Sequence, residues 1–199
     1  MKEIKLNSKV IITDPCYGLK DYPNPSANIV LDNVKAGIYK TNTHHSDEDM
    51  WGTRVAALEI IHEDYNPLKE SIEVVNLDLV ECIGSVCVDS GQMGIYDYDY
   101  YKSVSNDDGV DDNWYDEICK LTLSQEMSGT KDDLCVVSST GYGDGDYNVY
   151  IGTVNNEVVY IGIIFIGDDF DEFLEDEEEY FDDEEDEEFD FDELDEEEE

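Results

Sequence analysis

The last 32 residues of the chain, 168–199, limit what it can fold into more than any other feature does. They comprise 24 Asp or Glu residues, eight aromatic or leucine residues and no basic residue. So many like charges repel one another, and eight scattered apolar side chains cannot offset that repulsion and the entropy lost on ordering. We therefore expect a disordered acidic and aromatic tail at 168–199 and a globular, β-rich domain at 1–167.

The charge of the whole chain limits its partners. The net charge is −42, of which the tail contributes −24, so residues 1–167 carry −18 and contain all 11 Lys and Arg residues. No two of these basic residues are adjacent. Because contacts to phosphates need Lys or Arg, we expect no direct binding of nucleic acid and no anionic membrane as a partner. The expected partners are basic proteins or metal ions.

The N-terminus and the cysteines indicate the compartment. Residues 1–8 are polar and do not resemble a signal peptide, and the longest apolar stretch, Val158–Ile166, is shorter than the roughly 20 residues of a membrane span. The five cysteines contain no Cys-x-x-Cys pair. We expect reduced thiols and a cytoplasmic protein.

The domain at 1–167 is expected to be mainly β, with an α+β fold as the alternative. Its segments rich in Val, Ile and Tyr, bounded by Gly, Pro, Asn and Asp, predict a bent antiparallel sheet or a sandwich. One helix is predicted over Asp112–Leu121, with Asp111 and Asp112 at its N-terminus. A short turn at 154–157 predicts a hairpin between the last two strands. The predicted strands are Lys9–Thr13, Gly37–Thr43, Arg54–His62, Ser71–Val80, Gly84–Asp89, Leu134–Ser139, Tyr147–Thr153 and Val158–Phe165.

Two segments of the domain, Val88–Asp97 and Ser138–Tyr147, are dense in glycine. Glycine permits positive φ and a close approach of the backbone, so these segments could hold a ligand or could simply form turns. Neither contains a dinucleotide-binding or Walker motif, which favours turns.

Other candidate sites in the domain are weak. Cys16 could be a nucleophile only with a histidine nearby, and a small cysteine beside a strand is usually part of the packing. His44 and His45 are adjacent, so their rings should point in different directions, and His62 stands alone. The loop 106–113 is rich in Asp and Asn but lacks the Glu that an EF-hand needs. We assign no catalytic residue, no metal and no cofactor, and we expect no enzyme.

The charge spacing of the tail resembles that of nucleic acid. Duplex DNA carries one charge per roughly 1.7 Å of its axis, and a single strand one per roughly 3.4 Å. A helical tail would carry one charge per roughly 2.0 Å and an extended tail one per roughly 4.4 Å. A basic channel that binds phosphates should therefore accept it.

The aromatic residues of the tail could stack where a nucleic-acid-binding protein accepts bases, or anchor a segment that folds on binding. The alternative is that the charges only keep the chain soluble. The residues expected to bind a partner are Asp168, Asp169, Phe170, Asp171, Glu172, Phe173, Glu175, Asp176, Glu177, Tyr180, Phe181, Asp182, Asp183, Phe189, Asp190 and Phe191.

An acidic β-rich domain followed by an Asp/Glu/Phe tail resembles the early host-takeover proteins of large Bacillus phages, among them an inhibitor that mimics DNA on bacterial RNA polymerase. The stretches VDSGQMGIYD and SSTGYGDGDYNVYIG are similar to segments of uncharacterised phage and bacterial proteins. The resemblance implies that the tail occupies the DNA-binding channel of the polymerase in the host bacterial cytoplasm. It gives no individual residue a role.

Three functions follow as hypotheses. The first is a non-enzymatic inhibitor that shuts off host transcription by occupying the DNA channel of RNA polymerase, or of another basic DNA-binding protein, with its tail. The second is a β module that binds a small ligand through the glycine-rich segments, with the tail serving only solubility. The third is a chaperone for basic proteins such as chromosomal architectural proteins.

Overall fold

The computed structural model describes residues 2–19, 27–65, 80–106 and 109–167. By its internal contacts the chain divides into two units, Met1–Ile166 and Gly167–Glu199. All described residues except Gly167 belong to the first unit, whose fold is given below. The predicted tail and the partner-binding residues assigned to it lie outside the described residues.

The described part of the chain is mainly β, as predicted, and its paired strands are antiparallel. A six-stranded sheet has the order β1-β4-β5-β13-β12-β6, and a five-stranded sheet has the order β10-β11-β7-β2-β3. The strands of the first are β1 (Lys2–Leu6), β4 (Gly37–Asp47), β5 (Thr53–His62), β13 (Glu157–Ile164), β12 (Gly145–Val154) and β6 (Glu81–Val88). Those of the second are β10 (Ser128–Lys131), β11 (Cys135–Ser139), β7 (Gln92–Asp97), β2 (Val10–Thr13) and β3 (Asn28–Leu31).

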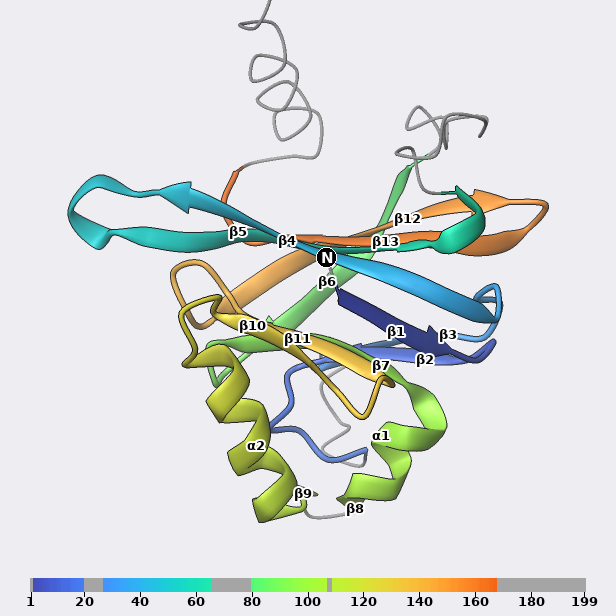
Figure 1. Ribbon diagram of the computed structural model, residues 1–199, viewed down its shortest axis with the longest axis horizontal. Helices are drawn as coiled ribbons and strands as arrows, with labels where there is room; N and C mark the ends of the chain where they lie inside the picture. Colours follow the sequence, from blue (N-terminus) through green and yellow to red (C-terminus); the bar gives the residue numbers. More distant parts are fainter. Residues whose placement is uncertain (1, 20–26, 66–79, 107–108, 168–199) are drawn as a thin grey trace, which may run out of the picture. The chain divides into compact units, whose positions relative to one another are not determined.

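The two sheets pack face to face, and both α-helices lie on the far side of the five-stranded sheet (Figure 1). The helices are α1 (Tyr98–Val104) and α2 (Asp112–Thr122). A short pair, β8 (Ser105–Asn106) with β9 (Gly109–Val110), and two 3-10 turns, Asp49–Trp51 and Glu63–Tyr65, complete the described elements. None of the described helices is long and apolar enough to cross a membrane.

The three central strands of the five-stranded sheet, β11, β7 and β2, are buried on both faces, which explains their many apolar residues. On β2, Val10 and Ile12 point into the core between the sheets, whereas Ile11 points into the core under the helices. On β7, Ile95 and Tyr96 divide in the same way. Because successive strand residues face opposite sides, a strand covered on both sides must be apolar throughout.

The helix predicted over Asp112–Leu121 is confirmed as α2. Its N-cap is Asp111, whose carboxylate accepts a hydrogen bond from the amide of Trp114 at 3.0 Å. The prediction of a single helix is wrong, because the domain contains a second helix, α1, which begins directly after β7. Asp97 ends the strand and caps α1 by accepting from the amides of Asp99 and Tyr100. The Tyr-rich sequence of α1 is typical of strands, so its cap was the main indication of a helix.

Seven of the eight predicted strands overlap observed strands. The eighth, Ser71–Val80, lies outside the described residues apart from Val80, which is not in a strand. The predicted hairpin is confirmed: Asn155 and Asn156 have φ of 52° and 66° between the paired residues Val154 and Glu157. Positive φ at both central residues makes this the turn type that suits the twist of a hairpin. The strands that sequence patterns did not predict are β1, β3, β7, β8, β9 and β10.

Candidate functional site

Four segments that are distant in sequence meet at one end of the five-stranded sheet. They are residues 14–17 after β2, residues 89–92 from the end of β6 to the first residue of β7, residues 140–144 between β11 and β12, and α2. Hydrogen bonds between the segments, described below, hold them together. We call this region the Asp14 cluster, after its buried carboxylate, which accepts four hydrogen bonds.

The carboxylate of Asp14 is fully buried and accepts four hydrogen bonds. Its Oδ1 accepts from the amide of Cys16 at 2.8 Å and from the hydroxyl of Ser90 at 2.6 Å. Its Oδ2 accepts from the amides of Asp89 and Ser90 at 2.9 and 2.7 Å. A buried charge is costly unless such bonds replace its hydration, so Asp14 fixes the 89–90 turn against the end of β2.

The two glycine-rich segments lie side by side. The amide of Thr140 donates to the carbonyl of Gly91 at 3.1 Å, and a Cβ on Gly91 would lie 3.6 Å from the Cα of Gly143. Within the second segment, the carbonyl of Gly143 accepts from the hydroxyls of Thr140 and Tyr147 at 2.7 and 2.6 Å. These backbone groups close the 140–144 turn.

Polar side chains connect the 89–92 turn to α2. The side-chain oxygen of Gln92 accepts from the hydroxyl of Thr122 at 2.8 Å. Its side-chain nitrogen lies 3.2 Å from the hydroxyl of Tyr115, 3.5 Å from that of Ser90 and 3.6 Å from the sulfur of Cys119. A hydrogen-bonded path therefore runs from Asp14 through Ser90 and Gln92 to the helix.

Two cysteines, Cys16 in the cluster and Cys135 in the five-stranded sheet, favour the thiol form. Burial and the neighbouring charge of Asp14 raise the pKa of Cys16, which disfavours the thiolate on which nucleophilic chemistry depends. Burial likewise raises the pKa of Cys135, on β11, to about 12. The histidines lie on strands of the other sheet: His44 and His45 on β4, and His62 at the end of β5.

His44 and His45 point to different places, as expected. The ring of His44 lies 2.9 Å from a carboxylate oxygen of Glu59, whereas that of His45 lies 3.2 Å from the carbonyl of Glu126, after a bulge in β4 between the two histidines. Hydrogen bonds from His44, Asn42 and Tyr160 outweigh the effect of burial and keep the pKa of Glu59 below its usual value. Among the described residues, no His, Cys, Asp and Glu side chains form a group that could hold a metal; Asp107 and Asp108 of the Asp-rich loop 106–113 lie outside them.

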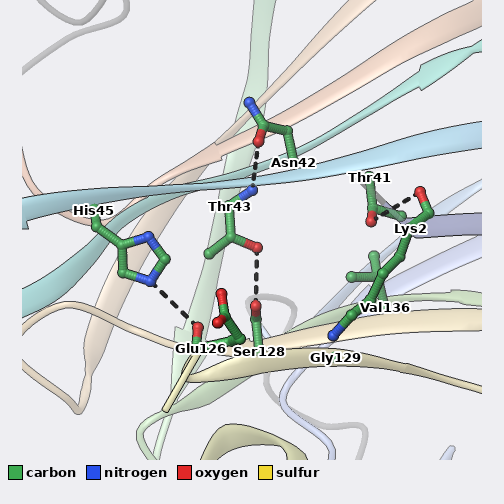
Figure 2. A pocket seen from close by; sticks show the side chains of 9 residues that line it. All are labelled: Lys2, Thr41, Asn42, Thr43, His45, Glu126, Ser128, Gly129 and Val136. Carbon is green, nitrogen blue, oxygen red and sulfur yellow. Dashed lines mark hydrogen bonds between the residues drawn. The ribbon is translucent and has the colours of Figure 1, made fainter. Parts of the chain in front are cut away.

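A small pocket opens between the two sheets beside β1 and β4. Figure 2 shows the hydroxyl of Thr43 donating to that of Ser128, at 3.1 Å, and His45 reaching the backbone of Glu126. Its volume of about 140 Å³ is smaller than the roughly 300 Å³ at which metabolite sites begin, and its polar groups bind one another. Sequence patterns did not indicate it. The lining residues are Lys2, Thr41, Asn42, Thr43, His45, Glu126, Ser128, Gly129 and Val136.

Comparison with known proteins places the domain in a family. The model of a family described as "Protein of unknown function (DUF4241)" matches residues 5–163, which is most of the chain. The chain belongs to the DUF4241 family. No curated protein and no solved structure matches the chain.

The DUF4241 match includes every segment of the Asp14 cluster and ends five residues before the acidic tail begins at Asp168. The features that make the chain a DUF4241 member are therefore those of the β domain alone. Sequence patterns drew attention to Cys16 and to both glycine-rich segments but not to Asp14, although an Asp-Pro step directly after an apolar strand indicates a side chain that binds nearby backbone amides.

Proposed function

We propose that the protein is a non-enzymatic inhibitor whose residues 168–199 mimic DNA and occupy the basic DNA-binding channel of bacterial RNA polymerase, or of another basic DNA-binding protein, in the host cytoplasm. The observation that carries the proposal is the charge of this segment, 24 carboxylates in 32 residues with no basic residue. A channel that binds phosphates presents the opposite charge over a similar length. The aromatic residues of the segment add apolar contacts in sites that accept bases.

The charges of the domain support this proposal. The domain has the same sign of charge as the segment, and several of its described lysines already form ion pairs. Lys9 lies 3.0 Å from Asp32, Lys35 lies 3.5 Å from Asp64, and Lys131 pairs with Glu117. The domain therefore carries a net negative charge and pairs several of its cations internally, which supports an external source of positive charge for residues 168–199.

The test is to neutralise the acidic segment at constant length. A variant with every Asp and Glu of 168–199 replaced by Asn and Gln should bind purified bacterial RNA polymerase at least about 100-fold more weakly and should no longer inhibit transcription from a linear template. Binding of the native chain should fall steeply with added salt. The matched control, a scrambled segment of the same composition, should keep both properties. Undiminished inhibition by the neutralised chain would refute the proposal.

A second candidate function is binding of a small ligand by the domain, with the tail serving solubility. It is favoured by the adjacency of Gly91 and Gly143, which brings both glycine-rich segments to one place inside the family match. The same experiment separates the two candidates, because this function should survive neutralisation of residues 168–199 unchanged.

A further inference from the structure

Three large apolar side chains are exposed together on the domain. Met50 and Trp51 lie in the 3-10 turn between β4 and β5 and are 98% and 67% exposed; Tyr142, in the turn between β11 and β12, is 58% exposed. The rings of Trp51 and Tyr142 meet edge to face, with their centroids 6.4 Å apart. We call these three residues the Trp51 patch. Exposed aromatic side chains grouped in this way are typical of binding surfaces.

The patch is held in place by hydrogen bonds. The carboxylate of Glu48 accepts from the hydroxyl of Ser46 at 2.6 Å and from that of Tyr142, which ties the two turns together. These bonds lower the pKa of Glu48. The amide of Trp51 donates to the carbonyl of Glu48 at 2.9 Å, and the side chain of Arg54 donates to the carbonyl of Trp51 at 3.0 Å. Aromatic rings fixed before binding lose little entropy when a partner docks.

Carboxylates lie around the patch and outnumber the neighbouring cation Arg54. Asp47 and Asp49 are exposed on the first turn, and Asp144 is exposed two residues after Tyr142. An indole face beside carboxylates attracts Arg and Lys side chains through cation–π and ionic contacts. A purely apolar partner would bury these charges without compensation, and a second copy of the chain would bring like charges together. The chemistry of the patch therefore fits a cationic occupant.

We propose that the Trp51 patch is a docking surface for an arginine- and lysine-rich segment of a nucleic-acid-binding protein. The inference rests on the proposed function in one respect, that the partner is basic, and it adds a second contact site on the domain. Arg and Lys side chains of the partner stack on Trp51 and Tyr142 and pair with the neighbouring aspartates.

The end of the domain lies close to this patch. The amides of Phe165 and Ile166 donate to the carbonyl of Ala56 at 2.7 and 3.1 Å, and a Cβ on Gly141 would lie 2.9 Å from Ile166. Gly141 directly precedes Tyr142, and the acidic segment starts at Asp168. The described end of the domain therefore lies beside the turn that carries Tyr142.

The two tryptophans provide the test, because Trp114 is only 5% exposed and its indole donates to the hydroxyl of Tyr100 at 2.9 Å. The full chain, labelled with nitrogen-15, is titrated with an oligoarginine peptide and its two indole resonances are followed by NMR. We expect the Trp51 resonance to shift and the Trp114 resonance to stay. The same shift is expected, at higher peptide concentration, in the chain with a neutralised 168–199 segment.

Substitutions test the energetic contribution. The double variant Trp51→Ala/Tyr142→Ala should bind the peptide about three- to ten-fold more weakly in the neutralised chain. Leu123→Ala is the matched control, since Leu123 is an 85% exposed apolar residue at the end of α2 that is not part of the patch, and this variant should bind normally.

The outcomes separate this proposal from the proposed function. A Trp51 resonance that stays in place while the native chain binds the peptide overturns the patch and leaves the tail function standing. A shift in the neutralised chain, combined with undiminished inhibition of transcription by that chain, supports the patch and refutes the tail function. Absence of any binding at low salt overturns both.

Discussion

Asp14 has no contact with solvent, and its carboxylate lies at the junction of four segments. Its two oxygens each accept two hydrogen bonds, so every donor that faces it is matched by an acceptor. Three of these donors are the backbone amides of Cys16, Asp89 and Ser90, which donate to Asp14 rather than to the backbone of a strand or helix. The position of the 89–92 turn, and through it the adjacency of the glycine-rich segments, therefore depends on one carboxylate.

This dependence predicts a large effect for a nearly isosteric change. In Asp14→Asn, the amide NH2 group replaces one carboxylate oxygen and faces two hydrogen-bond donors without being able to accept from them. The free energy of unfolding should therefore fall by about 2–3 kcal/mol. Asp89→Asn is the matched control in the same network: its carboxylate accepts only from the exposed hydroxyl of Tyr17, and the expected loss is below about 1 kcal/mol. Urea titrations of the three proteins measure the difference. Equal losses in the two variants would contradict the role assigned to Asp14.

At the scale of elements, sequence patterns predicted the long apolar strands and the longer helix but not the short ones. β10 consists of Ser, Gly, Thr and Lys and is a strand because β11 pairs with it, which is a tertiary effect that local propensity does not contain. β7 was assigned to a glycine-rich loop because it contains Gly94. The convergence at Asp14 could not be predicted, because contacts between residues 75 positions apart follow from the order of strands.

Gly94 shows why glycine occurs inside a buried strand. The ring of Tyr96, two residues along on the same face, folds back over Gly94 and fills the space that a side chain would take. In Gly94→Ala the new Cβ would collide with the hydroxyl and ring of Tyr96, which is fully buried beside Tyr101 and Trp114. We expect a loss of about 1–3 kcal/mol, measured by thermal or urea unfolding.

Gly145→Ala is the matched control for Gly94→Ala. Tyr147 lies over Gly145 in the same arrangement, but a Cβ there would stay 3.6 Å from the nearest atoms of the ring, an ordinary contact. The stability of this variant should change by less than about 0.5 kcal/mol. If both alanines proved equally harmless, the collision with Tyr96 would not be the reason for glycine in β7.

At the scale of the whole molecule, the net charge of −42 acts against compactness. Salt screens this repulsion, so the unfolding temperature of the native chain should rise by several degrees between about 0.05 and about 0.5 M NaCl. The chain with a neutralised 168–199 segment retains only the −18 of the domain and should show a smaller rise. Differential scanning calorimetry of both proteins measures the two slopes. Identical slopes would mean that the segment does not affect the stability of the domain.

The position of β13 has a consequence for how the protein is made. It is the third strand from one end of the six-stranded sheet, between β5 and β12, yet it is the last described strand to be synthesised. Its hydrogen bond from Tyr160 to Glu59 joins residues 101 positions apart. Contacts between residues so far apart in sequence raise the contact order of the domain, and a high contact order predicts slow folding. During translation the edge of β5 that pairs with β13 stays unpaired until nearly the whole domain has left the ribosome, and an unpaired edge is open to pairing with neighbouring chains.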